Sequence, residues 1–152
     1  MPQGTELLVV EREVHVAASP QTVFEFFTDP DKMTRWMGSV VELEPEPGGD
    51  LRIDLNGRWV ASGEFVEVTP PSRVVFTWGW EEGMAVAPGS STVEITLQPD
   101  GAGTLVRLTH RDLPSDEECA SHDHGWAGYL DRLAIATAGG DPGPDLVAEQ
   151  AT

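Results

Sequence analysis

One short segment, residues 119–126 with the sequence CASHDHGW, holds the only cysteine and two of the four histidines of the chain. Thiol, imidazole and carboxylate groups ligate zinc and transfer protons in enzymes. On a helix, His122 and His124 diverge by about 200° and cannot bind one ion together. Cys119 and Asp123 have i, i+4 spacing, but one thiol and one carboxylate make a poor site. The segment therefore predicts no metal centre.

The same segment belongs to a stretch that predicts a long helix over residues 115–138. Ser115 is a favourable N-cap, Glu118 completes a capping box with it, and a Gly-Gly pair follows as a common C-terminal stop. One stripe of this helix should face a sheet, and it holds Cys119, His122, Trp126, Leu130, Leu133 and Thr137. We therefore expect the imidazole of His122 to point inward.

Two more ionisable side chains are expected at this interior. His110 alternates in phase with the apolar residues of one predicted strand, and Glu64 alternates in phase with the valines of another. A bulge near Gly63 would turn Glu64 to the other face. Three interpretations stay open for His110, His122 and Glu64: core polar groups bonded to their neighbours, groups that orient a polar ligand head, or an acid/base set with pKa values shifted by burial.

The elements that must position these groups follow a simple order. Residues 6–16 predict a strand, and a capping residue followed by proline opens a short helix at Ser19 and again at Asp29. Residues 38–111 alternate apolar and polar side chains between turn residues, including an Asn-Gly hairpin signal at 56–57. This order predicts an α+β fold: an antiparallel sheet of about six to seven strands wraps around the long C-terminal helix, with two short helices after the first strand.

Large aromatic side chains are concentrated where the sheet and the helices should meet. The residues expected there are Trp36, Met37, Phe76, Trp78, Trp80 and Trp126. They either fill the core or line a cavity for a flat or greasy ligand, with methionine as an adaptable wall. The loop 80–91, which contains Gly and Pro, is placed to gate the mouth of such a cavity.

Composition narrows the class of protein. The chain has 152 residues, 39% of them hydrophobic, and five tryptophans, which predicts one folded domain. With 9 Lys plus Arg against 26 Asp plus Glu, the net charge of −17 argues against binding to nucleic acid or an anionic membrane. The sequence has no membrane-spanning apolar window, no signal-peptide pattern and a single cysteine, so a cytoplasmic location is expected. Residues 139–152 are expected to form a flexible acidic tail rich in Pro and Gly.

Several blocks, in order, resemble a known superfamily: DPDKMTRWMG, GEFVEVTPPSRVVFTWGW, GSSTVEITL, GAGTLVRLTH and HDHGWAGYLDRL. They resemble the SRPBCC (START-like, helix-grip) superfamily, and more narrowly the group related to the C-terminal domain of the Hsp90 ATPase activator Aha1. The resemblance covers residues 8–138 and implies a single START-like domain over residues 1–138, with a deep apolar cavity between the sheet and the C-terminal helix. The eukaryotic co-chaperone has an additional N-terminal domain, for which this chain leaves no room.

The favoured function is binding of a hydrophobic or aromatic small molecule in that cavity. The candidate ligand-binding residues are Trp36, Met37, Glu64, Phe76, Trp78, His110, His122, Trp126 and Leu130. No Gly-x-Ser-x-Gly motif, phosphate loop or dinucleotide fingerprint occurs, so no catalytic residue, cofactor or metal is assigned. One alternative is a cyclase/dehydratase-like enzyme that uses a cavity histidine as acid/base. The other is a chaperone-associated interaction module, with a chaperone or a second copy of the chain as partner.

Overall fold

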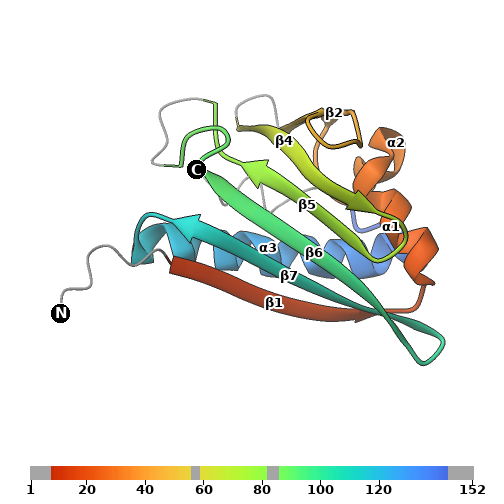
Figure 1. Ribbon diagram of the computed structural model, residues 1–152. Helices are drawn as coiled ribbons and strands as arrows, with labels where there is room; N and C mark the ends of the chain where they lie inside the picture. The colour runs from red at the N-terminus through yellow and green to blue at the C-terminus, as the bar shows by residue number, and fades with distance from the viewer. Residues whose placement is uncertain (1–7, 56–58, 82–85, 144–152) are drawn as a thin grey trace.

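Seven strands form one antiparallel sheet, and a long helix packs against one of its faces (Figure 1). The computed structural model describes residues 8–55, 59–81 and 86–143. In chain order the elements are β1 (Leu8–Val16), α1 (Pro20–Thr28), α2 (Pro30–Met33), β2 (Val40–Leu43), β3 (Asp50–Asp54), β4 (Val60–Thr69), β5 (Arg73–Trp78), β6 (Ser91–Asp100), β7 (Gly103–Leu113) and α3 (Asp116–Thr137). The predicted α+β class and order of elements are confirmed.

The strand order is β1-β7-β6-β5-β4-β3-β2. Strands β2 to β7 form a meander, and β1 pairs with β7 at its edge. Pairing between β6 and β7 is long and regular, and it runs from Thr92↔Arg111 to Asp100↔Gly103. Helix α3 crosses behind the sheet, while α1 and α2 lie together at one end (Figure 1). Helix α3 packs along β1, and its residues His122 and Trp126 contact His110 of β7 and Trp78 of β5.

Local signals explain where the helices begin. Ser19 accepts a hydrogen bond from Thr22 N at 3.3 Å, and Asp29 accepts one from Asp31 N at 2.9 Å. Ser115 caps α3 by accepting from Glu118 N at 3.1 Å. In each case the side-chain oxygen satisfies an amide that lacks a partner inside the helix. The carboxylate of Glu118 lies 3.6 Å from the Nδ1 atom of a histidine in the next turn.

The core lies between the concave face of the sheet and α3. Along β6 and β7 the inward positions are buried and alternate with outward polar ones, as a sheet with one solvated face requires. The buried residues of α3 are His122, Trp126, Tyr129, Leu130, Leu133 and Ala136. The predicted inward stripe is thus confirmed at its centre, while Cys119 and Thr137 at its ends are half-buried.

The C-terminal end of α3 is held by an arginine. Gly139 follows the helix with φ +89°, a left-handed conformation that favours glycine. Arg132 donates from Nε to Trp36 O at 2.9 Å and from Nη1 to Gly143 O at 3.1 Å. The expected flexible tail falls mostly on residues 144–152, which lie outside the described residues, and so does the hairpin signal at 56–57. Both stay predictions.

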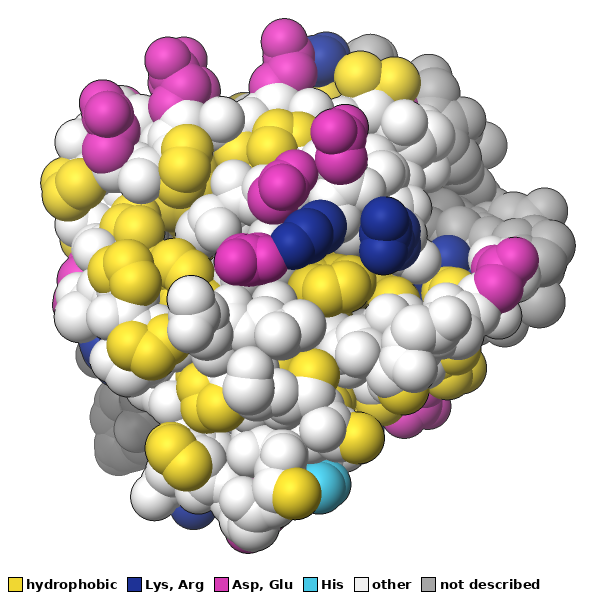
Figure 2. All heavy atoms as spheres, turned by 90° about the vertical axis from the view of Figure 1, so that its right-hand side faces the viewer, with side chains coloured by type: hydrophobic (Ala, Val, Ile, Leu, Met, Phe, Trp, Pro, Cys, Tyr) yellow, Lys and Arg dark blue, Asp and Glu magenta, His cyan; other side chains and the backbone are white. Residues whose placement is uncertain are grey.

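The surface carries the acidity of the sequence. Seen from the end where α1 and α2 lie, acidic side chains outnumber basic ones and are spread among exposed hydrophobic side chains (Figure 2). Most of the described arginines pair with a carboxylate, as Arg12 does with Asp123 at 2.8 Å and Arg52 with Glu81 at 2.9 Å. In the part of the chain that the structure describes, no helix is both long and apolar enough to cross a membrane.

Candidate ligand-binding site

The candidate residues divide into three locations. His110, His122, Trp78 and Trp126 converge at the end of the sheet next to the first turns of α3, and Phe76 adjoins them with its ring centroid 6.2 Å from that of Trp78. Three others, Trp36, Met37 and Leu130, are buried elsewhere in the same hydrophobic core. Glu64 lies on the opposite face of the sheet.

The first group is part of a larger set of touching rings, which we call the aromatic–histidine cluster: Trp59, Trp78, Trp80, His110, His122 and Trp126. The centroids of Trp78 and Trp126 are 5.3 Å apart, and those of the two histidines are 5.0 Å apart. The ring centroid of Trp80 lies 5.5 Å from that of Trp78 and 6.2 Å from that of Trp59. Most of these pairs are edge-to-face or tilted, the arrangements that aromatic quadrupoles favour.

His110 is bonded through both ring nitrogens. Trp126 Nε1 donates to His110 Nδ1 at 3.0 Å, so the imidazole proton must lie on Nε2. That proton points to Ser91 Oγ at 2.7 Å, and the Ser91 hydroxyl in turn donates to Trp78 O at 2.8 Å. The chain of donors and acceptors is complete only when the imidazole is neutral.

His122 is bonded in the opposite tautomer. Trp80 Nε1 donates to His122 Nε2 at 3.2 Å, which leaves the proton on Nδ1. Nδ1 lies 2.8 Å from the carbonyl oxygen of Glu118, one helical turn earlier, and donates to it. An indole N–H therefore fills the acceptor nitrogen of each histidine.

Burial reinforces the neutral state of both rings. Desolvation, together with a smaller contribution from the neighbouring His122, lowers the pKa of His110 to about 3. Desolvation also lowers the pKa of His122, against the opposing influence of the Glu118 carbonyl and carboxylate. Since all four ring nitrogens bond to protein groups, neither imidazole presents a charge or a vacant nitrogen to a substrate. Of the three interpretations, the arrangement fits core polar groups bonded to their neighbours.

Trp78 differs from Trp80 and Trp126, whose indole N–H groups both bond to a histidine. Its side chain is buried, with 3% of the residue exposed, and its Nε1 has no hydrogen-bond acceptor among the described residues. Leaving a buried N–H unsatisfied costs roughly 1–3 kcal/mol. Trp78 therefore brings to the apolar cluster an N–H donor for which the described residues supply no acceptor.

Of the two orientations left open for Glu64, the structure shows the outward one, so this candidate does not face the interior. Phe65, with 1% of its surface exposed, takes the inward position of β4, and both Glu64 and Val66 are exposed. A register shift between Phe65 and Glu67 interrupts the pairing of β4 with β5, so the alternation that placed Glu64 with Val68 does not hold across it. The backbone N–H of Glu64 donates to Thr77 Oγ1 at 2.8 Å.

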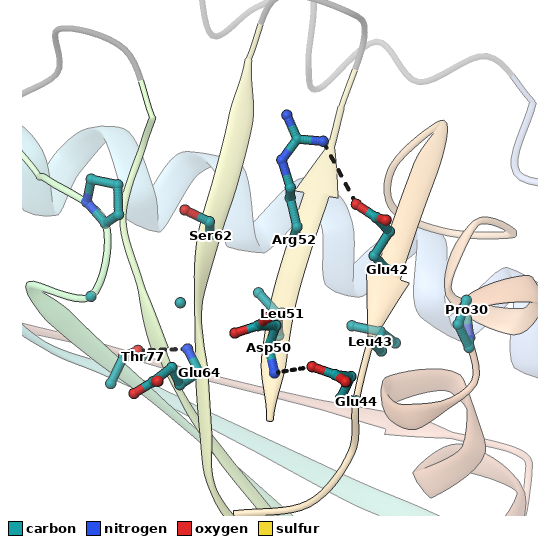
Figure 3. Close-up of a pocket in the computed structure, with 13 residues that line it drawn as sticks. Pro30, Glu42, Leu43, Glu44, Asp50, Leu51, Arg52, Ser62, Glu64 and Thr77 are labelled. Carbon is teal, nitrogen blue, oxygen red and sulfur yellow. Dashed lines mark hydrogen bonds and ion pairs between the residues drawn. The ribbon is translucent and has the colours of Figure 1, made fainter. Parts of the chain in front are cut away.

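A groove of about 950 Å³ lies around this outward-facing glutamate, with α3 behind the sheet (Figure 3). Its carboxylates are those of Glu42, Glu44, Asp50 and Glu64. The Arg52 guanidinium, also at the groove, bonds to Glu81 at 2.9 and 3.2 Å and lies 3.8 Å from Glu42. The groove carries four carboxylates beside apolar side chains, so it differs in place and in charge from the apolar cavity expected between the sheet and the helix.

The more distant candidates have structural partners. Trp36 is fully buried and donates from Nε1 to Phe26 O at 3.0 Å. The centroid of its ring lies 5.2 Å from that of Phe27. Sequence reasoning missed Ser91, Trp59 and Arg132. Ser91 shares the inward parity of the apolar residues of β6, which would have identified it, whereas nothing local indicated the contacts of Trp59 or Arg132.

Comparisons with known proteins agree with this geometry. The family model described as "Activator of Hsp90 ATPase homolog 1-like protein" (AHSA1) matches residues 17–138. The solution structure of an AHSA1-like protein from Rhizobium etli is 53% identical, with 92% of this chain and 88% of that chain covered and a TM-score of 0.74.

Two further structures extend the similarity. One is DynU16, described as a putative protein in the dynemicin biosynthetic locus, which is 26% identical and has a TM-score of 0.76. The similarity covers 88% of this chain and 48% of the DynU16 chain, so the present chain spans about half the length of DynU16. The other is the solution structure of an Aha1 dimer from Colwellia psychrerythraea, which shares the fold with a TM-score of 0.74. Its sequence is 18% identical, and the similarity covers 86% of this chain and 96% of that chain. No curated protein matches the chain. With most of its length matched by the family model, the chain belongs to the AHSA1 family.

Proposed function

We propose that the protein binds a hydrophobic or aromatic small molecule at the aromatic–histidine cluster, between the sheet and α3. The observation that carries this proposal is the continuity of the rings from the surface to the core. Trp59 and Trp80 are half-buried, while Trp78 and Trp126 behind them are buried. Small-molecule sites are mostly apolar and aromatic with a few placed polar groups, and this cluster has that composition.

The occurrence of DynU16 in a biosynthetic locus supports a small-molecule role for a relative with this fold. Acid/base catalysis, as in a cyclase or dehydratase, has less support because both cluster histidines are neutral and fully bonded. A general base needs a nitrogen within reach of the substrate proton. The function proposed here is therefore binding.

The test is a binding screen with flavonoids, polyketide-like aromatics and fatty acids, followed by thermal unfolding and tryptophan fluorescence. A ligand at one hundred times its Kd adds about 2.7 kcal/mol to stability, which raises the Tm of a domain of this size by several degrees. Trp80→Leu should weaken binding at least tenfold because it removes an outer ring of the cluster. Phe27→Leu, which shortens a buried side chain outside the cluster, should leave affinity unchanged.

The absence of binding to every compound, or equal losses in both variants, would overturn the proposal. A second candidate, a chaperone-associated interaction module, is favoured by the description of the family itself. Its test is the steady-state ATPase rate of a bacterial Hsp90 with and without the protein. Stimulation that persists in Trp80→Leu would assign that activity to a surface other than the cluster.

A further inference from the structure

We propose that the molecule bound at the cluster is uncharged and carries a carbonyl or ether oxygen that accepts a hydrogen bond from Trp78 Nε1. This inference rests on the proposed function and specifies its ligand class: a flat aromatic molecule with one acceptor at its edge. Three features of the cluster carry it, namely the donor, the occupied polar groups around it, and the charge.

The donor, Trp78 Nε1, contrasts with three indole N–H groups of the core whose bonds are described. Trp36, Trp80 and Trp126 donate to Phe26 O, His122 Nε2 and His110 Nδ1, at 3.0, 3.2 and 3.0 Å. Buried indole N–H groups usually find an acceptor, because an unsatisfied one is costly. Trp78 Nε1 has none among the described residues, so an acceptor supplied by a ligand would recover that energy.

The polar groups nearest to Trp78 are already in use. The Ser91 hydroxyl donates to the backbone oxygen of Trp78 and accepts from His110, and both histidines are bonded through both nitrogens. A ligand hydroxyl acting as donor would have to break one of these bonds. The indole N–H is a donor only, so the complementary ligand group is an acceptor.

Charge excludes anionic ligands, and the donor character of Trp78 Nε1 excludes ammonium groups as its partner. The described cluster contains no cation, and the charged group described against its histidines is the Glu118 carboxylate, 3.6 Å from His122 Nδ1. A buried carboxylate on the ligand would therefore be unpaired, at a cost of several kcal/mol, and the net charge of −17 repels anions at a distance. An ammonium group would be attracted by the indole faces and by Glu118, but it is a donor only and offers no acceptor to Trp78 Nε1. A neutral acceptor fits, whereas a fatty-acid anion does not.

The test uses three probes of one ring system: fluorene, 9-fluorenone, which adds a carbonyl oxygen, and ionised fluorene-9-carboxylate. Affinities are measured by calorimetry for the wild type and Trp78→Phe, which keeps an aromatic ring and removes the donor. The wild type should bind fluorenone roughly three- to tenfold more tightly than fluorene, because this ratio corresponds to the net free energy of one hydrogen bond. Trp78→Phe should bind the two equally, and the carboxylate should bind neither protein measurably.

Tyr129→Phe is the matched control, because it removes a polar group from a buried aromatic residue outside the cluster and should keep the preference for fluorenone. In ¹H–¹⁵N spectra the Trp78 indole resonance, identified by its absence in Trp78→Phe, should move downfield with fluorenone and not with fluorene.

Equal wild-type affinity for fluorene and fluorenone, or a preference that survives in Trp78→Phe, would overturn the inference and leave the binding function standing. Tight binding of the carboxylate would overturn the requirement for a neutral ligand. No binding of the neutral probes or of any compound in the wider screen would instead overturn the proposed function.

Discussion

At the scale of single residues, two indole N–H groups fix the protonation of two histidines. Trp126 donates to His110 Nδ1 and Trp80 donates to His122 Nε2. Protonation of either ring would place an N–H against an N–H and break the bond. Desolvation lowers the pKa of each histidine, and the two indole bonds favour the same neutral state.

The first prediction is that stability falls when the pH is lowered from 7.5 to 5. In the unfolded chain a histidine titrates near pH 6.5, whereas the pKa of folded His110 is about 3. Between these values the unfolded state binds a proton that the folded state does not. The stabilisation is complete above pH 6.5 and is lost toward pH 3, by up to about 1.4 kcal/mol per pH unit for each such histidine.

Urea unfolding at several pH values measures this slope, and His110→Gln provides the comparison. The glutamine amide keeps an acceptor for Trp126 and a donor for Ser91 but takes up no proton. Its slope between pH 7 and 5 should be shallower, while the contribution of the surface carboxylates stays the same in both proteins. Parallel curves would show that His110 is not held neutral in the folded state.

The sequence identified most of the inward aromatic and histidine side chains but not how they bond. Alternation along a strand and periodicity along a helix placed His110 and His122 correctly, because both patterns are local. The bonds that define their tautomers join residues 16 and 42 positions apart, and only the packed structure brings these together.

At the scale of elements, local signals predicted helices better than strand faces. The caps at Ser19, Asp29 and Ser115 all form, since each needs residues only two or three positions ahead. The face of Glu64 stayed open because the register shift at Phe65 depends on how β4 pairs with β5. A single strand read alone does not contain that information.

The second prediction contrasts two glycines. A Cβ at Gly63 would lie 2.0 Å from Thr77 O, a backbone atom that cannot move aside, so Gly63→Ala should destabilise the protein by about 2–3 kcal/mol. Gly125 lies inside α3 with nothing within 4 Å of its Cβ position, so Gly125→Ala should stabilise by up to about 1 kcal/mol.

Both changes are measured by urea unfolding of the two variants beside the wild type. Opposite signs would establish that one glycine is required by the close approach of β4 and β5 while the other only weakens a helix. A neutral Gly63→Ala would mean that β4 and β5 do not approach as closely as described.

At the scale of the whole molecule, the predicted fold was confirmed because it follows from the order of elements and from one packing requirement. An antiparallel sheet with one apolar face needs a cover, and the terminal helix was the only element long enough to supply it. The acidic groove outside the sheet was not predicted. It arises from Asp50 and Glu64, which the register of β3 and β4 places opposite each other.

The whole molecule also carries an excess of negative charge, which yields the last prediction. Exposed ion pairs such as Arg107–Glu13 contribute about 0–1 kcal/mol each and weaken in salt. Against this, 26 acidic residues face only 9 basic ones, so most carboxylates repel one another across a surface with few cations. Salt screens both effects, and the larger number of repulsive pairs decides the sign.

The free energy of unfolding should therefore rise between 10 and 500 mM NaCl, as followed by urea unfolding at pH 7.5, with KCl as a control for cation identity. A fall in stability would show that the arginine–carboxylate pairs, including Arg12–Asp123 between β1 and α3, outweigh the net repulsion.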